Sequence, residues 1–376
     1  MQPYDILIVG GGPAGSTLAY CLRESGLKIG ILDKQPFPRQ KICAGWVTPE
    51  VMRILNIDLE DYAQGRVLQA INGFKISQLG QKQLESIYPG EAVSYGIRRI
   101  EFDQYLLQRC EASVLPPQAC KRIKKTDDGW LINDALKTKL LVGAGGHYCP
   151  VARAIGSKQT GELAVVAQEA EFLMSAEQKQ NCSIQPQVPE LFFIPDLKGY
   201  GWVFRKGDYL NIGLGREDKH KLPGHVKSFC EYLAKLGKIP GDVSAHYDGH
   251  AYLLYHHARR KLIAEDALLI GDSAGLAYPQ SGEGIRPAVE SAILAANVIR
   301  DCAGDYSLAN LQAYNSTMEQ RFGKRQAEPG LMERLPTWMK KTLASQLMKT
   351  HWFTKNIVTD KWFLQSHQEP MPAIKK

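Results

Sequence analysis

The sequence predicts an α/β protein in which a βαβ-based domain is built from discontinuous segments, a strand-rich α+β domain is inserted between them, and a helical segment follows at the C-terminus. Two apolar runs flank a glycine-rich turn and a helical pattern within residues 6–32. A second strand–glycine–helix pattern begins near residue 267, and aromatic residues alternate along residues 200–204. Alternating strand and helix patterns favour a parallel sheet, because parallel strands need long crossovers that are usually helical.

Length and composition limit the class of protein. The 376 residues amount to about two and a half domains of ~150 residues, so two packed domains are expected. With 44% hydrophobic and 23% charged residues, the chain has the composition of a globular protein. Fibrous and disordered classes are therefore excluded.

Targeting and cysteine patterns are those of a cytoplasmic protein. No window approaches the ~18 uninterrupted apolar residues of a membrane-spanning helix, and the N-terminus lacks the basic stretch of a signal peptide. The eight cysteines form no CxxC pair, so neither a disulfide framework nor a zinc site is indicated. We expect a cytoplasmic protein with reduced thiols, no metal and no nucleic-acid partner.

The loop between the first strand and the first helix has the pattern of a dinucleotide-binding turn. It reads Gly10-Gly11-Gly12-Pro13-Ala14-Gly15. Gly10 permits the tight turn, Gly12 lets the backbone approach a pyrophosphate, and Gly15 lets the helix pack against the strand. Asp33 ends the next strand, where a carboxylate can accept hydrogen bonds from ribose hydroxyls, and Lys34 adjoins it at the same expected site. This unit is predicted to be Rossmann-like, with a purely structural glycine turn as the alternative.

A second glycine-and-acid loop indicates which dinucleotide is bound. The strand pattern Ala267–Ile270 is followed by Gly271 and Asp272, and a long helical pattern covers Pro287–Arg300. The residues before that helix that we assign to the cofactor are Gly282, Gly284 and Ile285. NAD alone has no use for a second loop, whereas in FAD a ribityl hydroxyl can bind Asp272 and the pyrimidine edge can face the helix start. The alternative is an N-capped surface helix.

Four stretches, spanning roughly residues 5–325, resemble a known family. They are Gly10–Gly15, Arg99–Asp103, Gly271–Asp272 with Pro279–Ile285, and Gly199–Gly207 followed by Asn211–Gly215. Together they are similar to the geranylgeranyl reductase family, within the para-hydroxybenzoate hydroxylase-type flavoprotein superfamily. The resemblance implies that Arg99 reaches the phosphate and ribityl region of bound FAD. It also implies an isoprenoid or another long apolar substrate.

The aromatic stretch has a strand period of two. Tyr200, Trp202 and Phe204 alternate with smaller residues and therefore share one face of a sheet, and Arg205–Asp208 are expected to form the hairpin turn that follows. From the residues alone, a face packed on core is as reasonable as a pocket wall. The resemblance favours a pocket opposite the flavin, in which Tyr200 and Trp202 contact substrate.

Two departures from the superfamily pattern bear on chemistry. Gly145 stands where many relatives carry an aspartate that serves both FAD and pyridine nucleotide, so a small reduced carrier is expected to reduce the flavin faster than NADH or NADPH. In the stretch Arg39–Gly45, Cys43 is retained and Ala44 replaces a glycine; Lys41, Cys43 and Ala44 are expected beside the cofactor. Cys43 either delivers a proton or contacts substrate, or it is a small buried residue.

These anchors set the expected domain boundaries. The FAD-binding domain comprises residues 1–65, 98–160 and 261–325, the substrate-binding sheet domain comprises 66–97 and 161–260, and a basic helical tail comprises 326–376.

The tail carries the charge excess of the chain. Residues 321–376 hold 11 Lys and Arg against 4 Asp and Glu, and the difference equals the net charge of +7. Trp338, Trp352 and Trp362 lie there within a helical pattern. This combination is typical of interfacial amphipathic helices, so peripheral contact with an anionic membrane through residues 330–376 is expected. The alternative is a helical layer packed on the protein itself.

The resemblance predicts an FAD-dependent oxidoreductase that reduces carbon–carbon double bonds of an isoprenoid or other apolar substrate by hydride transfer from reduced flavin N5. A flavin-dependent monooxygenase or halogenase of the same superfamily is one alternative. A non-catalytic flavoprotein that docks on a membrane is another. The glycine at position 145 and the segment that contains Tyr200 and Trp202 favour the reductase.

Overall fold

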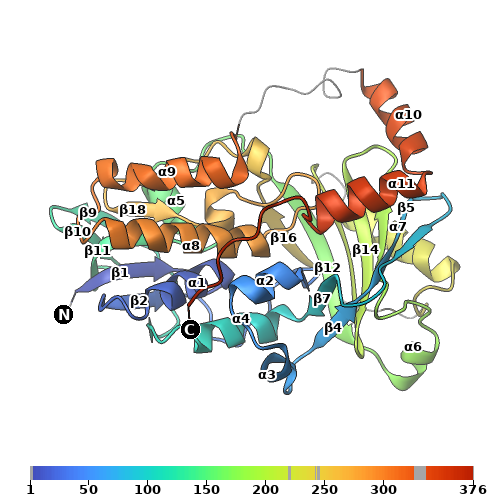
Figure 1. Ribbon diagram of the computed structural model, residues 1–376, viewed down its shortest axis with the longest axis horizontal. Helices are drawn as coiled ribbons and strands as arrows, with labels where there is room; N and C mark the ends of the chain where they lie inside the picture. Colours follow the sequence, from blue (N-terminus) through green and yellow to red (C-terminus); the bar gives the residue numbers. More distant parts are fainter. Residues whose placement is uncertain (1–2, 219–221, 242, 244–245, 326–335, 376) are drawn as a thin grey trace.

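The computed structural model describes residues 3–218, 222–241, 243, 246–325 and 336–375, and its largest sheet contains the predicted βαβ unit (Figure 1). Parallel strands follow the order β18-β11-β1-β2-β8, and β17, β10 and β9 add antiparallel strands. The bounds are β1 Tyr4–Val9, β2 Ile29–Leu32, β8 Ser113–Val114, β9 Ile123–Thr126, β10 Gly129–Ile132, β11 Leu136–Gly143, β17 Ile263–Ala264 and β18 Ala267–Leu269. Strands β1 and β2 are buried nearly throughout, as expected for apolar runs covered on both faces of a parallel sheet. The predicted fold class is confirmed.

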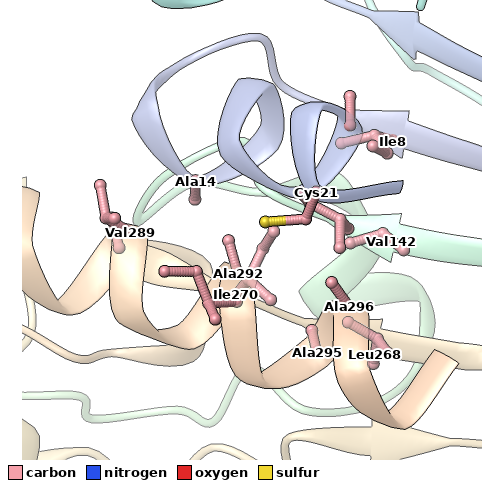
Figure 2. Close-up of a cluster of buried hydrophobic side chains, with 14 of the residues drawn as sticks. Ile8, Ala14, Cys21, Val142, Leu268, Ile270, Val289, Ala292, Ala295 and Ala296 are labelled. Atoms are coloured by element: carbon pink, nitrogen blue, oxygen red, sulfur yellow. The ribbon is translucent and has the colours of Figure 1, made fainter. Parts of the chain in front are cut away.

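Two helices pack on these strands through small side chains. Helices α1 (Pro13–Leu22) and α8 (Ile285–Asp301) contact each other, and Figure 2 shows Ala292, Ala295 and Ala296 of α8 on the side that faces α1 and the strands. Alanines keep the interhelical distance short, because that distance depends on the side chains at the contact. Burial raises the pKa of Cys21 on α1 to about 12, so this thiol is a neutral packing residue.

A seven-stranded sheet forms the second domain. Its order is β16-β12-β15-β14-β13-β5-β6. The bounds are β5 Gly73–Gln78, β6 Leu84–Ile87, β12 Val165–Leu173, β13 Glu190–Phe193, β14 Gly199–Lys206, β15 Tyr209–Arg216 and β16 Asp248–Tyr252. Helix α7 (Leu222–Lys235) covers one face, where the Phe229 ring lies 2.7 Å from the position that a Cβ on Gly201 would occupy. Trp202 and Phe204 face the opposite side, as their period-two spacing predicts.

Two expectations for this domain need correction. Of residues 66–97, strands β5 and β6 join the seven-stranded sheet as expected. Strands β4 (Leu68–Ile71) and β7 (Ser94–Ile97) do not, because β7 pairs on its two edges with β4 and with β3 (Trp46–Val47) in a separate three-stranded sheet. The turn after β14 is also shorter than predicted. Strand β14 continues through Lys206, whose side chain is 1% exposed, so this lysine is interior rather than part of a solvated turn.

The C-terminal segment lies against both domains. Helix α10 (Thr337–Leu347) is followed by α11 (His351–Phe353) and a π-helical stretch (Thr354–Phe363), which contributes Phe363 to the core of the seven-stranded sheet. The chain then returns to the parallel-sheet domain, where the Ile374 N–H donates to the carbonyl of Ile54 at 2.8 Å. Residues 326–335 of the predicted tail lie outside the described residues.

The other helices are mostly short. They are α2 Pro49–Ile54, α3 Leu59–Ala63, α4 Arg99–Gln108, α5 Pro150–Ala154, α6 Ala176–Gln180 and α9 Leu308–Phe322, with 3₁₀ turns at Tyr255–His257 and Gly271–Ala274. In the described part of the chain, every helix is too short or too polar to cross a bilayer.

Candidate functional site

A cavity of about 650 Å³ is lined by residues of both domains. One part of its wall comes from the carboxyl ends of β1 and β2, where ligands bind in open α/β sheets. A second part comes from segment 39–46 and the second glycine loop, and a third from β12, β14 and β16 with Phe363. Glycine loops and aromatic side chains thus share one continuous space.

The first glycine loop needs glycine at two positions for steric reasons. Gly10 has φ +116°, and a Cβ there would lie 2.4 Å from the carbonyl oxygen of Ala144. A Cβ on Gly15 would lie 1.9 Å from the carbonyl oxygen of Gly10. Only glycine therefore allows α1 to start this close to β1.

The same loop offers a site for a pyrophosphate. Gly12 lines the cavity, and α1 begins at Pro13 without a side-chain cap, so the N–H groups of its first turn can bind an anion. A Cβ on Gly12 would meet only side-chain atoms, those of Arg39 at 3.4 Å and Asp103 at 4.0 Å. The backbone here is open to a ligand, as FAD requires.

Charged side chains surround this loop. Asp33 Oδ2 accepts a 2.9 Å hydrogen bond from the Gly11 N–H, and Arg99 donates to both carboxylate oxygens of Asp103, at 2.7 and 2.8 Å. Arg39 lies 3.8 Å from Asp33 and 3.6 Å from Asp103, too far for hydrogen bonds. The guanidinium group of Arg39 is therefore better placed than that of Arg99 to bind phosphate oxygens, because Asp103 already accepts hydrogen bonds from Arg99.

The second glycine loop faces a polar chain of side chains. Lys41 Nζ lies 3.0 Å from His250 Nδ1, and His250 Nε2 lies 3.5 Å from Asp272 Oδ2. The pKa of Lys41 is lowered to about 8, mainly by burial and also by the nearby Arg99, although Asp272 raises it. Burial also lowers the pKa of His250. The side chains beside Asp272 thus offer several hydrogen-bonding groups to a polar ligand.

Aromatic side chains line the third part of the cavity. Tyr200 and Trp202 share it with Trp46, Tyr252 and Phe363. Trp46 and Phe363 stack with ring centroids 5.1 Å apart, and Phe363 contacts Tyr200 edge-on at 5.5 Å. The Tyr200 hydroxyl donates to the carbonyl of Ser281, which connects this wall to the second glycine loop. The cavity therefore has an apolar end suited to a hydrocarbon.

A buried polar network lies beneath the aromatic wall. Lys206 Nζ donates to the carbonyls of Ala44 and Ile97, both at 3.0 Å, and forms an ion pair with Glu171. Trp202 Nε1 donates to Asn211 Oδ1 at 2.8 Å. The network holds the segment around Cys43 against the sheet.

The structure brings most of the predicted site residues to the cavity wall. The residues that line it are Gly10, Gly12, Pro13, Ala14, Asp33, Lys34, Lys41, Cys43, Ala44, Arg99, Tyr200, Trp202, Asp272, Gly282, Gly284 and Ile285. Gly15 and Gly271 are not among the lining residues. Gly15 packs on Gly10, and Gly271, at φ +59°, packs against Ala14. Both glycines allow close packing of the loops without lining the cavity themselves.

Several lining residues were missed. They include Arg39, Gln118, Cys120, Tyr148 and Arg153, His250 in the polar chain beside Asp272, and Trp46, Glu169, Tyr252 and Phe363 at the aromatic end. Arg39 lies in the same stretch as Cys43, so its position in the sequence could have predicted that it lines the cavity. Glu169, His250 and Phe363 come from other elements without a local motif.

Comparison with known proteins agrees with this geometry. Residues 3–64 match the model of an FAD binding domain. The digeranylgeranylglycerophospholipid reductase of Thermoplasma acidophilum is 24% identical over 369 residues, which cover 86% of this chain and 85% of that protein. Over most of its length the chain is therefore similar to geranylgeranyl reductase-type proteins, and its N-terminal residues match an FAD binding domain.

Solved structures share the fold of this chain. A geranylgeranyl bacteriochlorophyll reductase-like protein from Thermoplasma acidophilum has a TM-score of 0.75 at 20% identity, covering 97% of this chain and 99% of that one. A probable FAD-dependent monooxygenase from Pseudomonas aeruginosa has a TM-score of 0.64 at 17% identity, covering 85% and 92%. The same architecture thus occurs in proteins described as reductases and as monooxygenases, so the fold does not assign the reaction.

Proposed function

We propose that this oxidoreductase reduces carbon–carbon double bonds of an isoprenoid or other long apolar substrate. The observation that carries the proposal is the aromatic end of the cavity, which is continuous with two glycine loops suited to FAD. Relatives described as digeranylgeranylglycerophospholipid reductases support the isoprenoid class. Bound FAD, once reduced, supplies the hydride that alkene reduction requires.

The chain itself contributes binding, orientation and exclusion of water. We assign the pyrophosphate to Gly12, the α1 N-terminus and Arg39, and the ribityl chain to Asp272 and His250. Tyr200, Trp202 and Phe363 would hold the hydrocarbon and keep the alkene in one orientation. Such positioning contributes a large share of catalysis when the reacting atoms must meet in one geometry.

The rival functions make different demands on the same cavity. A monooxygenase or halogenase would need reduced flavin to react productively with oxygen, and a non-catalytic flavoprotein would need no substrate pocket. The row of aromatic side chains suits an apolar substrate, and it therefore favours the alkene reductase over both rival functions. The electron donor is either a small reduced carrier or NAD(P)H, and the glycine at position 145 favours the carrier.

The test is reoxidation of the flavin by an alkene. Holoenzyme reduced with dithionite without oxygen should regain oxidised FAD when geranylgeraniol or digeranylgeranylglycerophospholipid is added, with a saturated product by mass spectrometry. Trp202→Phe should slow this step by roughly tenfold or more, because a lost contact in an apolar pocket costs about 1–3 kcal/mol. Absorbance of the flavin measures the rate.

A matched variant separates the pocket from the core. Phe192→Leu removes a buried aromatic side chain from the other face of the same sheet. It should lower the melting temperature but leave the alkene-dependent rate unchanged. Flavin that only oxygen can reoxidise in the wild type would contradict the proposed function.

We also propose that helices α10 and α11 contact anionic membranes. Trp338 and Trp352 are 69% and 65% exposed, and Lys341 and Lys349 on the same segment are exposed as well. Part of the tail's charge excess is used within the protein, since Arg321 pairs with buried Glu290. Each remaining lysine near an anionic surface contributes about 1 kcal/mol, which suits reversible attachment.

Flotation with vesicles tests the membrane contact. The full chain should float with vesicles rich in anionic lipid at low salt and less at high salt, since ions screen the attraction. The double change Trp338→Ala and Trp352→Ala should abolish flotation, whereas Leu163→Ala and Leu236→Ala, at exposed apolar positions elsewhere, should not. Equal flotation of both double variants would contradict the proposal.

A further inference from the structure

One buried carboxyl in the cavity wall has no role in the site described above. Glu169, on β12, is 5% exposed and lines the cavity. Its Oε1 accepts a hydrogen bond from the Cys43 N–H, and its Oε2 is buried with no hydrogen-bond partner in the described part of the chain. An ionised carboxylate would leave that oxygen's charge unsolvated, so the arrangement favours the neutral acid.

The row of residues around Glu169 places it beside the aromatic wall. Glu169 pairs with Gly213 on β15, and Gly213 pairs with Trp202 on β14. A Cβ on Gly213 would lie 2.2 Å from the Trp202 ring and 2.8 Å from the Glu169 Cβ. The absence of a side chain at Gly213 thus lets the indole lie over the strand, next to Glu169.

Charges from the surrounding elements act on this carboxyl in both directions. The pKa of Glu169 is raised to about 7, mainly by burial and also by Glu171 on the same strand, although Lys206 and the Cys43 N–H lower it. Asn211 also favours the ionised form of Glu169. The positive charge of Arg99 acts on the neighbouring Cys43 thiol. A pKa near neutrality suits a group that must give up a proton and regain it.

We propose that Glu169 is the proton donor in alkene reduction. This rests on the proposed function. One alkene carbon receives a hydride from the reduced cofactor, and the π electron pair then forms a bond between the other carbon and the Glu169 proton. The O–H bond of the acid breaks as this C–H bond forms. Glu169 is left as a carboxylate, the cofactor is left oxidised, and water restores the proton.

Cys43 is the competing donor, and acidity separates the two. Burial raises the pKa of the Cys43 thiol above its ordinary value of 9.0, although Arg99 lowers it. The carboxyl, with a pKa of about 7, is therefore at least about 100-fold more acidic. Glu169 is the stronger acid at the same part of the cavity.

The test compares the wild-type holoenzyme with Glu169→Gln and Cys43→Ala. Glutamine keeps the shape and can still accept from the Cys43 N–H, but it has no acidic proton. Dithionite-reduced proteins are mixed with geranylgeraniol or digeranylgeranylglycerophospholipid, and flavin reoxidation is followed across neutral pH. We expect E169Q to retain FAD and to slow reoxidation by about 100-fold or more. The wild-type rate should fall as pH rises through 7, and E169Q should lack this dependence.

A second readout does not depend on turnover. A carboxyl whose pKa is raised from 4.5 to about 7 in the folded state stabilises the protein below pH 4.5, and this contribution is lost as pH rises through 7. The melting temperature of wild-type holoenzyme should therefore fall relative to that of E169Q across this range. Parallel melting curves would overturn the assignment of Glu169 as a neutral acid.

The outcomes distinguish this proposal from the function on which it rests. If the wild type fails to reoxidise with either alkene, the proposed function is wrong and the proton-donor role falls with it. If the wild type turns over and E169Q is equally fast, only the role of Glu169 is overturned. Loss of turnover in C43A together with full turnover in E169Q would assign the proton to the thiol instead.

Discussion

Replacing Lys206 with methionine should lower the stability of the protein by about 3–5 kcal/mol, the cost of breaking a buried ion pair by removing one partner. The Lys206 side chain is 1% exposed, and its ammonium group pairs with Glu171 and donates to the carbonyls of Ala44 and Ile97. Methionine fills a similar volume, but it can neither pair with the Glu171 carboxylate nor donate a hydrogen bond to the two carbonyls. A thermal melt should show a fall of about 4–6 °C.

The same change should loosen the cofactor. Ala44 lies in the cavity wall, and a Cβ on neighbouring Gly45 would lie only 2.6 Å from Lys206 Nζ, so the lysine supports this loop directly. Lys198→Met is the matched control, because Lys198 is half-exposed and pairs with Asp218 at the surface. Exposed pairs contribute roughly 0–1 kcal/mol, so the control should melt close to the wild type. Equal melting of both variants would contradict the structural role of Lys206.

Gly15→Ala should yield protein that purifies without flavin and with reduced stability. The new methyl group would lie 1.9 Å from the carbonyl oxygen of Gly10, so α1 must move away from β1. Overpacking of this kind costs about 1–3 kcal/mol and sometimes more. We expect FAD to be lost because the same movement displaces the N–H groups assigned to the pyrophosphate. Flavin released by heat, measured per mole of protein, gives the result.

A control shows whether any methyl in a helix has this effect. Gly224 lies in the first turn of α7 with nothing within 4 Å of its Cβ position. Gly224→Ala should retain flavin and gain up to about 1 kcal/mol, since alanine is the better helix former. Full flavin content in Gly15→Ala would show that the loop tolerates a shift of α1.

The two glycine loops were predictable because the contacts that require glycine are local. Gly10 and Gly12 lie between β1 and α1, and Gly15 lies in the first turn of α1. The close contacts of Gly10 and Gly15 follow from this short connection. Asp272 and Gly284 likewise lie in a loop between a strand, β18, and a helix, α8. Spacing along the chain is enough to predict such a site, since each residue acts on backbone a few positions away.

Lys206 illustrates where local reasoning fails. The Arg205–Asp208 stretch resembles a polar turn, and a lysine there is expected in solvent. In the structure it is interior, because Glu171 on β12 and two carbonyls from other segments compensate its charge. No pattern near residue 206 contains those partners.

Only tertiary packing brings together the residues at the aromatic end of the cavity. Glu169 comes from β12, Trp202 from β14 and Phe363 from the C-terminal π-helical stretch, and cross-strand register through Gly213 sets the first two side by side. The α/β class, the FAD loops and the aromatic face follow from periodicity and short spacings in the sequence. The partners of that face depend on which distant strands pair and in which register, and a shift of one residue would turn every side chain of a strand to the other face.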